Sequence, residues 1–109
     1  TDSGLKYYDI APGEGGELHR GQLAEIHYTA WLTDGTMFDS SLEYGNPVVI
    51  PIGVGGALPG LDEGVSSMRI GGKRQLVIPP ELAYGEEGVE GVIPPNATLI
   101  FEIELIDAQ

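Results

Sequence analysis

Two segments of this chain alternate apolar and polar residues, and this pattern constrains the fold more than any other feature. In residues 23–32 and again in residues 98–107, every second side chain is apolar and the residues between are mainly polar. A period of two predicts strands that bury one face and expose the other. The residues expected to face inward are Ala24, Ile26, Tyr28, Ala30 and Leu32 in the first segment, and Leu99, Phe101, Ile103 and Leu105 in the second.

Shorter segments predict further strands. Residues 73–78 follow a Gly-Gly turn, and residues 5–10 have the composition of an edge strand. Residues 48–52 also predict a strand, in which Pro51 indicates an edge position or a bulge because proline cannot donate a backbone hydrogen bond. An Asp-Gly pair directly after residues 23–32 favours a hairpin turn.

One segment has helical spacing instead. The apolar residues that recur three to four positions apart are Leu58, Leu61, Val65 and Met68. Pro59 suits a first helical position, whereas Gly60 and Gly64 each weaken a helix by roughly 1 kcal/mol relative to alanine. Such a helix needs a sheet to pack on. We therefore predict an α+β domain in which an antiparallel sheet of five to six strands packs on one short α-helix.

Composition limits the classes of protein that this chain can belong to. Its 109 residues predict a single domain, residues 1–109, and the absence of cysteine excludes disulfides. The net charge of −12 argues against nucleic acid as a partner. The apolar residues 48–58 are too few and too interrupted for membrane insertion. Without a leader at residue 1, we expect a soluble protein that is either cytoplasmic or exported after loss of a leader.

Motifs of other enzymes are weak here. The glycines of residues 53–56 resemble a phosphate-binding loop, but Leu58 stands where a dinucleotide fingerprint needs glycine. Ser40 or Ser41, near Asp39 and with His27 elsewhere, supply the residue types of a hydrolase triad, without the context of a nucleophile elbow. The sequence therefore gives little support to either reading.

Charged and metal-binding residues are also sparse. Two histidines are too few for a confident metal site, and Glu86, Glu87 and Glu90 lack the spacing of a calcium loop. We expect no metal and no cofactor, and we expect these glutamates to be solvated. The basic residues Arg69, Lys73 and Arg74 lie close together, and ordinary solvated surface is favoured over a partner patch.

Four blocks of sequence resemble, in order and spacing, the FKBP-type peptidyl-prolyl cis-trans isomerases. They are His-Tyr-Thr at 27–29 with Phe-Asp-Ser-Ser at 38–41, Pro-Gly-Leu-Asp-Glu-Gly at 59–64, Pro-Pro-Glu-Leu-Ala-Tyr-Gly at 79–85, and residues 93–101. The resemblance implies a twisted antiparallel sheet curled around the helix. It also implies an activity, the acceleration of X–Pro bond rotation in flexible polypeptides.

The resemblance further implies a shallow apolar pocket between helix and sheet. Its catalytic residues would be Tyr28, Phe38, Asp39, Leu61, Tyr84 and Phe101, and its substrate-binding residues would be Val48, Ala57, Leu58, Val89, Val92 and Ile93. In this scheme the Leu58 N–H and the Tyr84 hydroxyl donate to substrate carbonyls. We expect Asp39 to be held by hydrogen bonds, with the Tyr28 hydroxyl as a donor, because an unpaired buried carboxylate is costly.

Two departures from the family pattern bear on the ligands. Leu61 stands where most active members carry tryptophan, and Val48 replaces a common aromatic residue. We therefore expect a wider pocket that binds macrolide inhibitors more weakly while isomerase activity is retained. The expected partners are proline-containing polypeptides, and the expected state is a monomer. The alternative function is a binding module or chaperone with little turnover.

Overall fold

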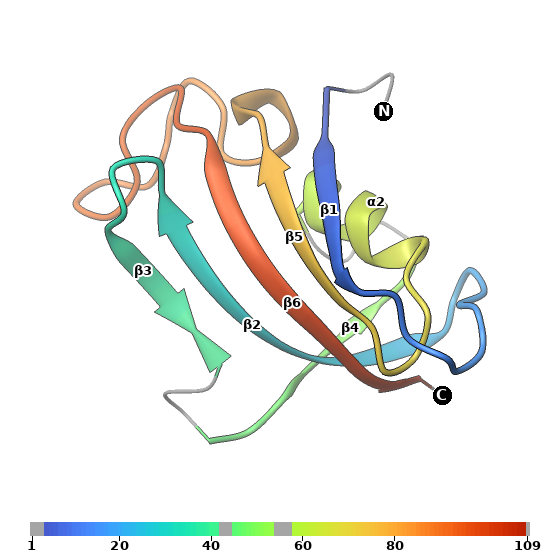
Figure 1. Ribbon diagram of the computed structural model, residues 1–109. Helices are drawn as coiled ribbons and strands as arrows, with labels where there is room; N and C mark the ends of the chain where they lie inside the picture. The colour runs from blue at the N-terminus through green and yellow to red at the C-terminus, as the bar shows by residue number, and fades with distance from the viewer. Residues whose placement is uncertain (1–3, 42–44, 54–57, 109) are drawn as a thin grey trace.

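The computed structural model of the protein describes residues 4–41, 45–53 and 58–108 (Figure 1). Its strands are β1 (Lys6–Ala11), β2 (Leu23–Leu32), β3 (Met37–Ser40), β4 (Val48–Pro51), β5 (Lys73–Ile78) and β6 (Leu99–Ala108). They form one antiparallel sheet in the order β1-β5-β6-β2-β3, and β4 pairs with the first half of β2. The helix α2 (Pro59–Ser66) lies against one face of this curved sheet (Figure 1). A short 3₁₀ turn, η1 (Pro80–Leu82), follows β5.

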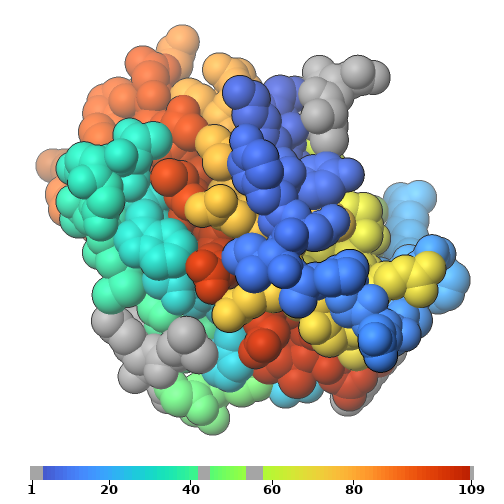
Figure 2. Space-filling view, in the orientation of Figure 1, coloured from blue at the N-terminus to red at the C-terminus, as the bar shows by residue number. Residues whose placement is uncertain are grey.

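The two alternating segments form the central strands, as predicted. Strands β2 and β6 pair along nearly their whole length, from Ala24 with Ala108 to Leu32 with Leu99. Their inward side chains join those of α2 in a single core that includes Ile26, Phe101 and Val65. The opposite face of the sheet is turned to the viewer in Figures 1 and 2, and no described helix covers it. In the part of the chain that the structure describes, no helix is long and apolar enough to cross a membrane.

The helix begins at Pro59, the expected first position, but it ends at Ser66, so that Met68 packs in the core just beyond it. Its two glycines have a packing reason. A Cβ atom on Gly64 would lie 2.5 Å from both terminal methyl groups of Leu76, and a Cβ on Gly60 would overlap Ile78 Cγ2. Both positions must stay small because the helix backbone lies directly on β5.

Arg74 is not solvated surface, and this expectation was wrong. Only 6 % of the residue is exposed, because it lies on the helix-facing side of β5. Its guanidinium donates to the Gly64 carbonyl at 3.0 Å and to Ser67 Oγ at 2.6 Å, both at the carboxyl end of α2. It also pairs with Asp9 of β1 at 2.6 Å and stacks on the Tyr7 ring at 4.2 Å. One side chain therefore joins the helix to the edge strand.

The hairpin between β2 and β3 is closed by the predicted Asp-Gly pair. Gly35 has a φ of +91°, which glycine adopts without strain, and the Thr36 N–H donates to Asp34 Oδ1 at 2.8 Å. This hydrogen bond, assisted by the Thr36 side chain, lowers the pKa of Asp34 from its ordinary value of 3.8. The turn joins β2 to β3, the strand that carries the half-buried Phe38 and Asp39.

The lowered pKa of Asp34 has a testable consequence for acid stability. Since the folded state binds this proton less readily than the unfolded chain, the stabilisation is present above pH 3.8 and is lost as the pH falls through the folded pKa. Carboxyl-detected NMR titration should therefore place Asp34 below 3.8, and Thr36→Ala should raise its pKa part of the way. A titration of Asp34 at or above 3.8 in the unmodified protein would contradict this assignment.

Candidate active site

A cavity of about 210 Å³ lies between the sheet and the first turn of α2. Strands β2, β3, β4 and β6, the start of the helix, and the segment after η1 all contribute to it. The residues that line it are Ile26, Tyr28, Phe38, Asp39, Val48, Ile50, Leu58, Leu61, Tyr84 and Phe101. Seven of these ten side chains are purely aliphatic or phenyl groups, and Asp39 is the one charged group among them. The lining is therefore apolar with a few polar atoms.

Three aromatic rings form one side of the cavity. The Phe101 ring packs against Tyr28 with centroids 5.9 Å apart and against Phe38 with centroids 6.3 Å apart in an edge-on arrangement. Such tilted and edge-to-face pairs are favourable because the positive edge of one ring meets the negative face of another. Phe101 itself is buried, so this side of the cavity is also part of the core.

The Asp39 carboxylate in the cavity is held by hydrogen bonds. Asp39 accepts from the Tyr28 hydroxyl at 2.5 Å through Oδ2 and from the Ser40 N–H at 2.9 Å through Oδ1. The predicted hydrogen bond between Tyr28 and Asp39 is therefore present. The backbone at Tyr28 is fixed in turn, because its N–H donates to the buried Ser41 Oγ at 2.8 Å.

This arrangement does not support the hydrolase alternative. The Ser41 hydroxyl lies 3.0 Å from His27 Nδ1, but Ser41 is fully buried and its oxygen already accepts from the Tyr28 N–H. The Asp39 carboxylate is bound to Tyr28, with no hydrogen bond to His27 among the described contacts. A triad needs an accessible nucleophile and a carboxylate that orients the histidine, and neither condition is met.

Residues 15–106 match the family model for the FKBP-type peptidyl-prolyl cis-trans isomerase. The chain belongs to this family. It is 52% identical to the FK506-binding protein of Neisseria meningitidis serogroup B, over 94% of each chain. It is 47% identical to the FKBP-type 22 kDa peptidyl-prolyl cis-trans isomerase of Escherichia coli, over 98% of this chain and 51% of that protein.

The fold comparison agrees with the family assignment. The crystal structure of AtFKBP13 matches with a TM-score of 0.93 and 42% sequence identity, covering 98% of this chain and 94% of that one. The predicted resemblance and the predicted α+β fold are both confirmed. In this FKBP-type chain, eight of the twelve residues expected at the site line the cavity, from Tyr28 in β2 to Phe101 in β6.

Three of the other four residues lie in the loop after η1 and do not line the cavity. Ile93 is buried in the core, and Val89 is packed against it and donates its N–H to the Ile93 carbonyl at 2.8 Å. Val92 is 51% exposed and faces away from the core. Tyr84, where this loop begins, is 38% exposed at the edge of the cavity. The fourth residue, Ala57, lies outside the described residues.

Two residues of the cavity were missed as site residues, although the sequence carried a signal for both. Ile26 was expected to face inward from its strand, and Ile50 lies in the predicted strand at residues 48–52. Alternation places Ile26 on the same face as Tyr28 and places Ile50 on the same face as Val48. A core residue and a cavity residue both face inward and differ only in whether other side chains pack over them. The periodicity of the sequence does not indicate this difference.

Proposed function

We propose that this FKBP-family domain accelerates cis-trans rotation of X–Pro bonds by enclosing the proline in the cavity beside Phe101. The observation that carries the proposal is an apolar cavity in which the one carboxylate, that of Asp39, is held in place by the Tyr28 hydroxyl. Its volume of about 210 Å³ lies below the roughly 300–1,000 Å³ of drug-sized ligand pockets and suits one side chain. The partner is therefore a proline residue within a flexible polypeptide.

The physical basis is the loss of amide resonance during rotation. Rotation about a peptide bond meets a barrier of roughly 18–20 kcal/mol, and X–Pro isomerisation takes tens to hundreds of seconds without catalysis. The twisted transition state is less polar than the planar ground state, so water stabilises it less. A site that removes water therefore favours the twisted form, and each ~1.4 kcal/mol of difference gives about tenfold in rate.

The polar groups then position the substrate. Leu58 directly precedes the helix, and no described residue accepts a hydrogen bond from its N–H. That N–H and the hydroxyl of the exposed Tyr84 are the proposed donors to substrate carbonyls on either side of the bound proline. Asp39 completes the set as a carboxylate oriented by Tyr28. We expect the domain to act as a monomer.

Replacing Asp39 tests whether its charge contributes. We expect Asp39→Asn to lower kcat/KM for a model peptide about five- to tenfold, equivalent to roughly 1–1.4 kcal/mol of transition-state stabilisation. Asp39→Leu should lower it further because the Tyr28 hydroxyl then loses its acceptor. Thermal unfolding of each variant separates this effect from loss of the fold. Unchanged activity in both variants would eliminate an electrostatic role.

Replacing Leu61 tests the effect of the family departure on inhibitors. Leu61→Trp should tighten the binding of a macrolide such as FK506, because the larger indole face increases apolar contact at the floor of the cavity. Titration of tryptophan fluorescence or calorimetry would give the dissociation constants of both proteins. An unchanged or weaker affinity in the variant would count against the proposed role of Leu61.

A refolding assay separates catalysis from mere binding. The protein is added in catalytic amounts to a denatured protein whose refolding is limited by proline isomerisation, and a cis-enriched tetrapeptide is measured in parallel. Acceleration of both reactions at substoichiometric enzyme supports turnover. Binding of the peptide without acceleration would favour the alternative function, a module that docks proline-containing partners. The replacement of the usual tryptophan by Leu61 is the sequence feature that supports this alternative.

A further inference from the structure

A second groove, of about 600 Å³, lies in the loop after Tyr84, outside the cavity just described. Its apolar side is formed by Val92, Ile93, Pro94 and Pro95, and the carboxylates of Glu87 and Glu90 lie on its border. Tyr84 links the two regions, since it borders the cavity and its carbonyl accepts the Gly88 N–H of the loop at 3.2 Å. Tyr84 therefore connects the loop that forms the groove to the edge of the cavity.

The groove is preformed by hydrogen bonds within the loop. The Ile93 N–H donates to the Val89 carbonyl and the Val89 N–H donates back to Ile93, both at 2.8 Å, while the Asn96 N–H donates to the Gly85 carbonyl at 2.8 Å. Gly88 has a φ of +62°, and a Cβ atom there would overlap the Ile93 carbonyl. A ligand would thus meet a surface that is already ordered, which lowers the entropic cost of binding.

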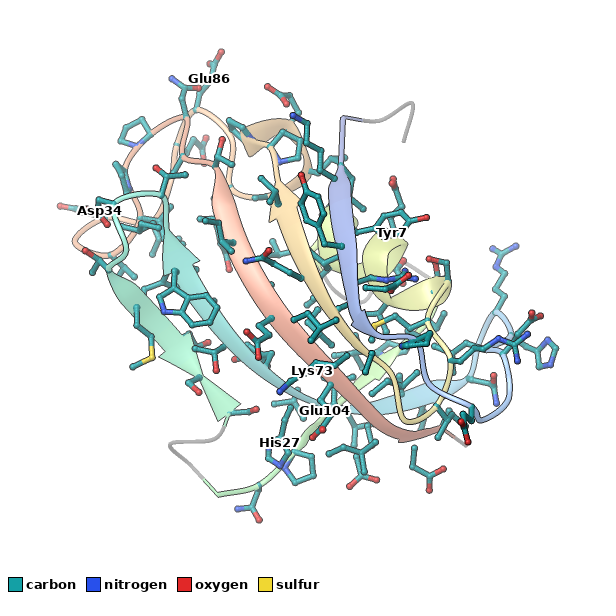
Figure 3. The ribbon with its side chains drawn as sticks, in the orientation of Figure 1. Tyr7, His27, Asp34, Lys73, Glu86 and Glu104 are labelled. Carbon is teal, nitrogen blue, oxygen red and sulfur yellow. The ribbon has the colours of Figure 1, made fainter. Side chains whose placement is uncertain are left out.

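In the part of the chain that the structure describes, no ion pair compensates the acidic side of the groove. After Arg74 the sequence contains no lysine or arginine, and no described residue forms an ion pair with Glu87 or Glu90. Glu86 projects outward from the same loop, and Asp34 lies at the same end of the molecule (Figure 3). The carboxylates of Glu87 and Glu90 are therefore available to pair with a cation of another molecule.

We propose that this groove binds a lysine or arginine of the substrate polypeptide, close to the isomerised proline. Long basic side chains combine an aliphatic stem with a charged head. The stem suits Val92 and Pro94, while the head pairs with Glu87 and Glu90. The proposal rests on the proposed isomerase function and assigns it a substrate class, flexible polypeptides that carry a basic residue near proline.

A metal ion fits this groove less well than a basic side chain. Among the described residues, no group of three or more histidine or acidic side chains is placed to hold a metal ion. Two carboxylates beside valine and proline side chains supply too few oxygen ligands for calcium, which takes six to eight. The apolar side of the groove instead offers contact to an organic side chain.

Matched peptides test the proposal directly. Peptides with lysine, glutamine or glutamate at each flanking position of one X–Pro bond are compared by kcat/KM at low and high salt. At low salt we expect lysine peptides to exceed glutamate peptides by roughly three- to tenfold, and salt should reduce this ratio. In the double variant Glu87→Gln/Glu90→Gln, the ratio of kcat/KM for lysine peptides to that for glutamate peptides should approach one.

A control variant removes the same charge elsewhere. Glu14 and Glu104 are exposed, lie outside both sites and form no described ion pair, so Glu14→Gln/Glu104→Gln should keep the ratio of the unmodified protein. NMR shifts of the Val92 and Ile93 amides on adding the lysine peptide should appear in the control and weaken in the groove variant. Equal rates for lysine and glutamate peptides, or a ratio that survives in the groove variant, would overturn the inference. Failure to accelerate even the glutamine peptide would instead contradict the isomerase function, and the substrate assignment would fall with it.

Discussion

Replacing Arg74 with methionine is expected to lower the free energy of unfolding by about 2–3 kcal/mol, a large loss for a domain of this size. The variant leaves the Gly64 carbonyl without the donor that it has in the native protein. It also removes the ion pair with Asp9 and the contact with the Tyr7 ring. Because Asp9 is partly exposed, water can hydrate its carboxylate in the variant. The expected loss of stability is therefore smaller than the cost of leaving a fully buried charge without a partner. Urea denaturation followed by circular dichroism measures the change.

Two matched variants identify the source of this loss. Arg74→Lys keeps the charge but lacks the planar fork that reaches two elements at once, so it should recover less than half of the stability. Asp9→Asn leaves the contacts with Gly64 and Ser67 intact and should cost less than Arg74→Met. If Asp9→Asn were as harmful as Arg74→Met, the helix contacts would contribute nothing and the ion pair alone would account for the effect.

Replacing Gly60 with alanine should also destabilise the protein, although helix propensity predicts a gain. An alanine in a helix is favoured over glycine by roughly 1 kcal/mol. The added Cβ would overlap Ile78 Cγ2 and lie 3.2 Å from the Leu82 carbonyl oxygen, and Ile78 is fully buried on a stiff strand. Overpacking of this kind costs typically 1–3 kcal/mol, which exceeds the gain in helix propensity, so we expect a net loss of up to about 2 kcal/mol.

The Gly60 variant should affect activity as well. Pushing the first turn of α2 away from β5 displaces Leu58 and Leu61, which line the cavity, and kcat/KM should fall several-fold. Gly16 is the control, because no atom lies within 4 Å of a Cβ built there and its φ is not positive. Gly16→Ala should leave both stability and activity close to those of the unmodified protein. A Gly60→Ala variant that is more stable than the parent would show that the helix can shift without cost.

The central elements of the fold could be predicted from the sequence because each has a local signal. Strands β2 and β5 have the predicted bounds, and β6 differs from its prediction by one residue at each end. The helix was predicted from four apolar residues, and its start at Pro59 follows from local chemistry. The residue pairs of the cavity, such as Tyr28 with Asp39, were predicted only through the family resemblance.

The errors have a common physical cause. Arg74 was placed on the surface because a basic residue near others of its kind is usually solvated, yet the pairing of β1 with β5 and the position of α2 surround it with acceptors. Gly60 and Gly64 weaken a helix in isolation, and only the contact with β5 shows why they are required. Val92 was assigned to the cavity, but the turn formed with Val89 directs it outward.

By itself, therefore, the sequence determined which segments become strands and helix, which faces they bury, and to which family the chain belongs. The elements and their buried faces depend on residues that are near one another along the chain, and the family depends on the order and spacing of short motifs. The tertiary structure alone decided which polar group is desolvated, which glycine must stay small and which side chains border the cavity rather than the loop groove. Those properties depend on contacts between segments that are distant along the chain. The local periodicity of the sequence does not indicate which of these segments come together.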